Sequence, residues 1–172
     1  MGSEDDRTGQ LRLMHWEAAV DAIGEHPVLG VGYENWMSYY SDINPTFAQE
    51  IHNTFLEVPA ELGIPGALLF FGLVVGSFAT NRRTRRRLRE LGPWGAVMHG
   101  MAKGLDVAMV GLLVASTFMS VLFWPVYWMH FALSVALSET SKRLALHAPR
   151  TVHVPRAVPS HPSLPAVARV GQ

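Results

Sequence analysis

At 172 residues the chain is long enough for one ordinary domain, and its formal net charge of zero would suit a soluble protein. It contains no cysteine, which excludes disulfides, thiolate nucleophiles and cysteine-ligated zinc. The zero sum hides an uneven distribution: residues 1–62 carry eleven acids and two arginines, whereas residues 63–172 carry twelve bases and three acids. Such a division is expected when a membrane separates the two halves of a chain.

The first predicted element is an amphipathic helix over residues 11–25. Its apolar residues recur at steps of three and four from Leu13 to Ile23, with acids on the other faces. Pro27 ends it. The glycine-rich stretch 29–36 predicts a turn, because glycine punctuates regular structure.

A second, short helix is predicted to begin at Asn44 and Pro45. Asparagine is a favoured helix cap, and proline is tolerated in the first helical turn. This helix would carry His52 near its C-terminal end or just beyond it.

Residues 63–80 contain no charged side chain, and six arginines follow between Arg82 and Arg89. At about 1.5 Å per residue, this run is just long enough to cross a hydrocarbon core of about 30 Å. A buried core helix and a nucleic-acid patch are the alternative interpretations of the two segments. Their adjacency favours a membrane span followed by a basic cytoplasmic segment.

A second apolar block covers residues 105–138 and is interrupted by Trp124 and Pro125. As a single helix it would be about 50 Å long, which exceeds the hydrocarbon core. Two spans are therefore expected, with an aromatic outer turn between them. An odd number of spans also places both basic segments on the cytoplasmic side, as the positive-inside rule requires.

The predicted fold class is all-α integral membrane, with three transmembrane helices after a short helical periplasmic region. The C-terminal tail is rich in proline and has little to bury, so it is expected to be disordered. The predicted order is an extracytoplasmic region 1–62 that carries the candidate motifs, spans at 63–80, 105–123 and 126–140, a cytoplasmic arginine-rich loop 81–104 and a cytoplasmic tail 141–172.

Two side chains of the first region suit group-transfer chemistry. Arg12, four residues before Trp16, has a planar, permanently charged fork that can donate two hydrogen bonds to a phosphate. His52 has an imidazole ring, and such a side chain can accept or return a proton in catalysis. The alternatives are a solvated surface arginine and a histidine that satisfies backbone carbonyls. The remaining histidines lack the spacing of metal ligands, so no metal site is expected.

Four short motifs occur in a characteristic order. They are Arg12-x-x-x-Trp16, His26-Pro27-Val28-Leu29-Gly30-Val31-Gly32, His52-Asn53-Thr54-Phe55-Leu56-Glu57 and Glu61-Leu62-Gly63-Ile64-Pro65-Gly66. Their combination closely resembles the C-terminal part of the O-antigen ligase and polymerase family of bacterial inner-membrane glycosyltransferases. The likeness covers residues 8–138.

The resemblance implies transfer of a glycan from an undecaprenyl-diphosphate carrier to an acceptor hydroxyl at the periplasmic side. The acceptor is a lipid, a polysaccharide or a protein. By resemblance, His52 corresponds to the essential catalytic histidine and Arg12 to an arginine that binds the donor diphosphate. Neither a cofactor nor a metal is implied, and nucleic acid is not an expected partner.

The chain departs from the family in its number of spans. Complete members have many more spans than are predicted here, so this chain alone is expected to be inactive unless another polypeptide supplies the N-terminal half. The alternative from a different functional class is a non-catalytic, membrane-anchored fragment that binds a partner.

Overall fold

The computed structural model describes residues 3–147, with side chains described from Gly9 onward. This part of the chain is helical and contains no strand, which confirms the all-α prediction for it. Residues 141–147 of the tail predicted to be disordered are helical, and the rest of that tail lies outside the described residues. The elements are α1 (Ser3–Glu25), α2 (Trp36–Ile43), α3 (Thr54–Glu90), the 3-10 helix η1 (Gly92–Gly95), α4 (Ala96–Ala115) and α5 (Pro125–His147).

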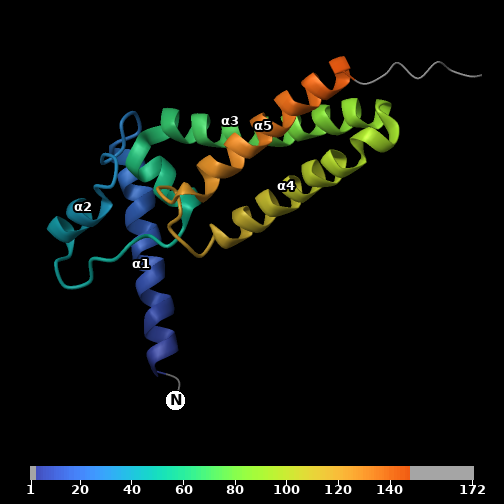
Figure 1. Cartoon of the computed structure of the whole chain (residues 1–172). Coiled ribbons are helices and arrows are strands. Elements are labelled where there is room, and N and C mark those ends of the chain that lie inside the picture. The colour runs from blue at the N-terminus through green and yellow to red at the C-terminus, as the bar shows by residue number, and fades with distance from the viewer. Residues whose placement is uncertain (1–2, 148–172) are drawn as a thin grey trace, which may run out of the picture.

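The long helices α3, α4 and α5 run alongside one another, and α1 and α2 lie at one end of this bundle (Figure 1). The α4–α5 turn lies at the same end as α1. The end of α3, the start of α4 and the end of α5 lie together at the opposite end, which carries the arginines (Figure 1). The chain therefore separates its acidic and basic segments along the bundle.

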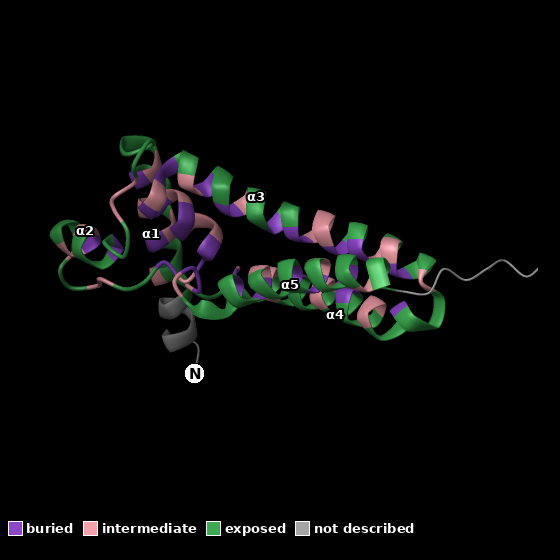
Figure 2. Ribbon diagram, turned by 45° about the horizontal axis from the view of Figure 1, so that its top comes forward, coloured by how far each residue is buried: buried purple, intermediate pink, exposed green. Residues whose placement is uncertain are grey.

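The outer surface of the bundle is apolar. Figure 2 shows exposed residues along most of the outer faces of α3, α4 and α5, and large aliphatic side chains such as Leu69, Val107 and Val135 are among them. Large exposed apolar surfaces are unusual in soluble monomers and mark contact with a partner or a membrane. By length and composition, two helical segments could cross a membrane, Thr54–Glu90 and Gly92–Ala115.

The helix boundaries differ from the predicted spans. α3 continues through the arginines to Glu90, and α4 begins at Ala96, so most of the segment predicted as a loop is helical. Arginine is a good helix former, which allows the helix to outlast its apolar part. α4 then ends at Ala115, before the predicted end of the second span at residue 123. The arginines therefore indicate where a membrane span would end, but the helix itself continues beyond them.

The short helix predicted from Asn44 is wrong, because the helix lies before this residue. Asn44 caps the C-terminus of α2, and its backbone N–H donates to the Tyr40 carbonyl. Within α2, Trp36 and Tyr40 are buried and stacked, with ring centroids 5.4 Å apart. Residues four apart share one face of a helix. The aromatic pair therefore explains why the helix forms here.

Polar contacts join the helices at the basic end of the bundle. The Arg85 guanidinium on α3 forms an ion pair with Asp106 on α4, and the Asn81 side-chain amide donates to the same carboxylate over 2.9 Å. Arg87 donates to the Ser141 hydroxyl of α5 over 2.8 Å. Because these partners belong to three different helices, they fix the far ends of the bundle against one another.

Candidate functional site

The second and fourth sequence motifs meet at a break in α3. Gly63 has φ 68° and ψ −179°, so the helix is interrupted there. Pro65 has no backbone N–H and cannot donate to the carbonyl of Glu61. The backbone N–H of Gly32 donates to that carbonyl instead, over 3.1 Å. A residue of the second motif thus replaces the hydrogen bond that the proline of the fourth motif removes.

Two further backbone hydrogen bonds complete this joint. Val31 N–H donates to the carbonyl of Ala60, and Ile64 N–H donates to the carbonyl of Pro27, each over 2.8 Å. The helix break frees both the Ala60 acceptor and the Ile64 donor, which would pair with each other in an unbroken α-helix. We call these three backbone hydrogen bonds the Gly63 joint.

The Gly63 joint leaves no room for side chains at its two central glycines. A Cβ atom added to Gly63 would lie 2.4 Å from the Val28 carbonyl oxygen, and one added to Gly30 would lie 2.3 Å from the Glu61 carbonyl carbon. Both glycines also have positive φ, which side-chain-bearing residues adopt at a cost. The spacing of glycines in both motifs is therefore explained by a single close contact of two backbones.

The first motif positions the loop that carries His52. The Trp16 indole N–H donates to the backbone carbonyl of Ile51 over 3.0 Å. One position earlier on α1, the buried His15 ring lies with Nε2 2.8 Å from the Phe47 carbonyl oxygen. Two consecutive residues of α1 therefore hold the segment that leads into His52.

The α4–α5 turn holds the same loop from the other side. The His52 backbone N–H donates to the Ser120 hydroxyl over 3.1 Å, and Thr54 N–H donates to the Ser116 carbonyl over 2.8 Å. The Thr54 hydroxyl donates to the Met119 carbonyl over 2.8 Å. The start of α3 is capped by Asn53, whose side-chain oxygen accepts from Phe55 N–H over 3.0 Å. The loop is thus fixed by residues that lie more than sixty positions away in the sequence.

His52 itself has a left-handed backbone and a partly open side chain. Its φ is 52°, which is uncommon outside glycine and is often retained at functional positions. The side chain is 41% exposed, and Nδ1 lies 3.9 Å from a carboxylate oxygen of Glu50. The ring is therefore accessible to a substrate while its backbone is held by Ser120.

Arg12 is exposed on α1, one turn before Trp16. Four helical residues correspond to about 6 Å along the axis. Trp16 in turn contacts Ile51, the chain neighbour of His52. Among the described side chains, none forms a hydrogen bond or ion pair with Arg12. The structure brings the elements that carry Arg12 and His52 together, and it shows no contact between the two side chains.

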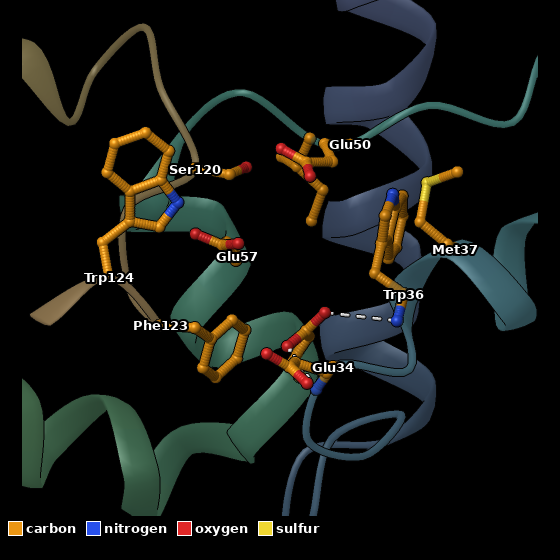
Figure 3. A pocket seen from close by; sticks show the side chains of 10 residues that line it. Glu34, Trp36, Met37, Glu50, Glu57, Ser120, Phe123 and Trp124 are labelled. Carbon is orange, nitrogen blue, oxygen red and sulfur yellow. Dashed lines mark hydrogen bonds between the residues drawn. The ribbon is translucent and has the colours of Figure 1, made fainter.

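An acidic cavity of about 400 Å³ opens beside the His52 loop (Figure 3). Four of its lining residues are glutamates and three are aromatic. Its lining includes Glu34, Glu50, Glu57, Glu61, Trp36, Phe123, Trp124 and Ser120. No lysine, arginine or histidine lines it. It is therefore suited to neutral or cationic ligands and unsuited to a phosphate.

Two of these glutamates differ in the hydrogen bonds that their carboxylates accept. Glu61 accepts backbone hydrogen bonds from Trp36 over 3.2 Å and from Glu34 over 3.0 Å (Figure 3). Glu57 is 7% exposed, and its Oε2 has no partner among the described residues. Both residues precede the break at Gly63, outside the charge-free run. Burial, followed by the charge of Glu61, raises the pKa of Glu57 to about 7.

Sequence reasoning missed the cavity and the support from the α4–α5 turn. Glu57 and Glu61 each belong to a recognised motif, and their spacing of four residues puts them on one face of a helix, but no local pattern indicates that this face lines a cavity. Ser116 and Ser120 lie in no motif, and only the fold reveals their contacts. The described residues contain no group of three or more histidine or acidic side chains arranged to hold a metal ion.

Comparison with known proteins gives a family match for the N-terminal part of the chain. The family described as O-antigen ligase matches residues 1–71, which include all four motifs and the break at Gly63. No curated protein and no solved structure matches the chain significantly. The matched segment ends within α3, so it covers the His52 loop and the Gly63 joint and excludes the α4–α5 turn.

Proposed function

Because the O-antigen ligase family model matches residues 1–71, we propose that this chain forms the C-terminal portion of a membrane glycosyltransferase of the ligase or polymerase type. The donor would be a glycan on undecaprenyl diphosphate, and the acceptor a hydroxyl group of a lipid, a polysaccharide or a protein. The observation that carries the proposal is the contact between Trp16 and Ile51, which places the Arg12 helix against the His52 loop.

In the proposed reaction, the acceptor oxygen attacks the anomeric carbon of the donor sugar. The new carbon–oxygen bond forms as the bond to the diphosphate breaks, and the bonding electron pair leaves with the diphosphate. His52 accepts the proton of the attacking hydroxyl, which is otherwise a poor nucleophile. Arg12 stabilises the charge that develops on the departing diphosphate through its two parallel N–H groups.

The geometry supports this division of roles. The His52 ring is exposed enough to meet a hydroxyl group, and its backbone is tied to Ser120 on the α4–α5 turn. Arg12 is exposed on α1 and is not neutralised by the described side chains, so it can receive a diphosphate. The acidic cavity repels phosphate, which favours binding of the diphosphate at the Arg12 face.

We also propose that α3, α4 and α5 all cross the inner membrane, with residues 1–62 on the periplasmic side. The acidic region and the α4–α5 turn share one end of the bundle, and the arginines lie at the other end. This arrangement agrees with the positive-inside rule for three spans. Additional spans from another polypeptide or segment would complete the groove for the lipid carrier.

The orientation can be tested by labelling single cysteines, because the chain has none of its own. In intact spheroplasts, Ser38→Cys on α2 should react with an impermeant maleimide. Glu90→Cys, at the end of α3 after the arginines, should react only after permeabilisation. Both positions are exposed and lie outside the apolar runs, so burial does not confound the comparison. Labelling of Glu90→Cys alone in intact spheroplasts would invert the proposed orientation.

The catalytic role can be tested with His52→Ala in the complete gene product. Glycan transfer to the acceptor should be abolished while membrane insertion and protein level stay unchanged. His147→Ala is the matched control, since His147 is exposed and its ring Nδ1 lies 2.8 Å from the Arg143 carbonyl oxygen of its own helix. Retained transfer by His52→Ala would remove His52 from the catalytic role.

A further inference from the structure

We propose that the acidic cavity is a binding site for one neutral sugar ring of the glycan substrate. In this arrangement a hydroxyl group of the sugar donates to the free oxygen of Glu57, and an apolar face of the ring lies against Trp124. The identification of the ligand as a glycan rests on the proposed function. The shape and polarity of the site rest on the cavity itself.

The unpartnered carboxylate oxygen of Glu57 points to a ligand that donates hydrogen bonds. Glu57 is more than nine-tenths buried, and its Oε2 has no partner among the described residues. Figure 3 shows the carboxylate directed into the cavity, between Glu50, Ser120 and Phe123. Buried polar atoms are nearly always paired in folded proteins, because an unpaired one costs free energy. A hydroxyl donor in the cavity would supply the missing partner.

The charge of the cavity excludes an anionic ligand. Glu34, Glu50, Glu57 and Glu61 line it, and no basic side chain does. A diphosphate would be repelled, whereas a hydroxyl group donates to a carboxylate without carrying charge itself. The resulting hydrogen bond to an ionised acceptor is roughly twice as strong as one between neutral groups.

The aromatic side chains account for the remaining surface of the cavity. Trp124 is 55% exposed, and Phe123 lies opposite Glu57 (Figure 3). Large rigid rings supply apolar contact area, and a few polar groups fix the orientation of a bound ligand. A sugar ring presents C–H groups on its faces and hydroxyls at its edge, so it matches both kinds of surface. The volume of about 400 Å³ lies within the range of small-molecule sites.

The cavity is placed where such a ring would lie close to the proposed base. Glu50 and Ile51 line it and immediately precede His52 in the chain. Ser120 also lines it, and the same hydroxyl accepts the His52 backbone N–H. The site therefore separates two recognition tasks, with the sugar in the acidic cavity and the diphosphate at the exposed Arg12.

The test is a direct binding measurement on the chain in detergent micelles, without a lipid-linked donor. The probes are methyl glycosides of glucose, galactose and N-acetylglucosamine, titrated at about pH 8, where a carboxyl of pKa near 7 is ionised. Saturation-transfer NMR detects the bound sugar, and the change in tryptophan fluorescence on binding includes Trp36 and Trp124, two of the five tryptophans, which line the cavity. Saturable binding of at least one glycoside is expected.

Glu57→Leu should weaken this binding at least tenfold, because it removes the charged acceptor of the sugar hydroxyl. Leucine keeps much of the side-chain volume and removes the unpaired oxygen, so the fold should be retained. Glu90→Leu is the matched control on the same helix, since Glu90 is exposed at its far end. It should leave sugar binding unchanged.

Three results would overturn the proposal: no saturable response to any glycoside, equal affinity in Glu57→Leu, or saturable Mg²⁺ binding that depends on Glu57 in place of sugar binding. The outcome is separable from that for glycan transfer. Sugar binding should survive His52→Ala, because His52 does not line the cavity. If sugar does not bind in the cavity but glycan transfer still depends on His52, the proposed function stands. If sugar binds in the cavity but transfer does not depend on His52, only the proposed function is removed.

Discussion

Replacing Gly63 by alanine should strongly destabilise the chain. The residue has φ 68°, and the left-handed conformation costs alanine about 1–2 kcal/mol. The added Cβ would also lie 2.4 Å from the Val28 carbonyl oxygen, so the two backbones must separate. Separation breaks the three hydrogen bonds of the Gly63 joint, each with a net contribution of about 0.5–1.5 kcal/mol. The expected loss of unfolding free energy is about 3–6 kcal/mol.

The assay is SDS-induced unfolding in mixed micelles, followed by tryptophan fluorescence. Trp36 is a suitable reporter because it is buried and lies next to the Gly63 joint through its hydrogen bond to Glu61. Gly72→Ala is the matched control, since it lies later in α3 and a Cβ there would meet nothing within 4 Å. The control should be neutral or stabilising by up to about 1 kcal/mol. Equal unfolding curves for the two variants would refute the role of the joint.

Two further predictions concern the His52 loop and the acidic cavity. Trp16→Phe should lower the unfolding free energy by about 0.5–1.5 kcal/mol, because it removes the hydrogen bond to the Ile51 carbonyl. Trp94→Phe is the control, since Trp94 is exposed, and it should have little effect. Equal losses in the two variants would contradict the anchoring role of Trp16. The pKa of Glu57 is raised on folding from 4.5 to about 7, so the neutral carboxyl favours the folded state below about pH 4.5, and this stabilisation is lost as the pH rises through about 7. At about 1.4 kcal/mol per pH unit, the unfolding free energy of the wild type should fall by up to about 3 kcal/mol relative to that of Glu57→Gln between about pH 4.5 and 7. Parallel curves of unfolding free energy against pH for the two proteins would contradict this prediction.

The sequence predicted the elements whose signal is local. The periodic apolar residues up to Ile23 indicate α1, which ends at Glu25, and the charge-free run 63–80 lies within a helix long enough to span a membrane. Apolar periodicity and charge-free runs depend on residues that are close in the sequence, so they can predict a helix without knowledge of the rest of the fold. The short helix predicted from Asn44 failed because cap residues mark either end of a helix, and the packing of Trp36 against Tyr40 decided which end this was.

The site could be predicted only in part, for a different reason. His52 and Arg12 stand in motifs with recognisable chemistry, and the family match supports the resemblance that drew attention to them. The cavity depends on Ser120 and Trp124, which lie far along the chain in the α4–α5 turn. No local pattern indicates that this turn lies against the start of α3. That contact is made by Thr54, whose hydroxyl both donates to Met119 and accepts from Val121.

The short helical segment between Asn53 and Gly63 explains why the four motifs occur together. One end of it is held by the His52 loop and the α4–α5 turn, and the other by the Gly63 joint. Glu57 and Glu61 lie between these two attachments, four residues and about one helical turn apart, so both side chains face the same cavity. A change at either attachment would therefore rotate or shift both carboxylates relative to His52. On this reasoning, the glycines and prolines of the motifs have no chemical role of their own and act by fixing the distance between the proposed base and the cavity.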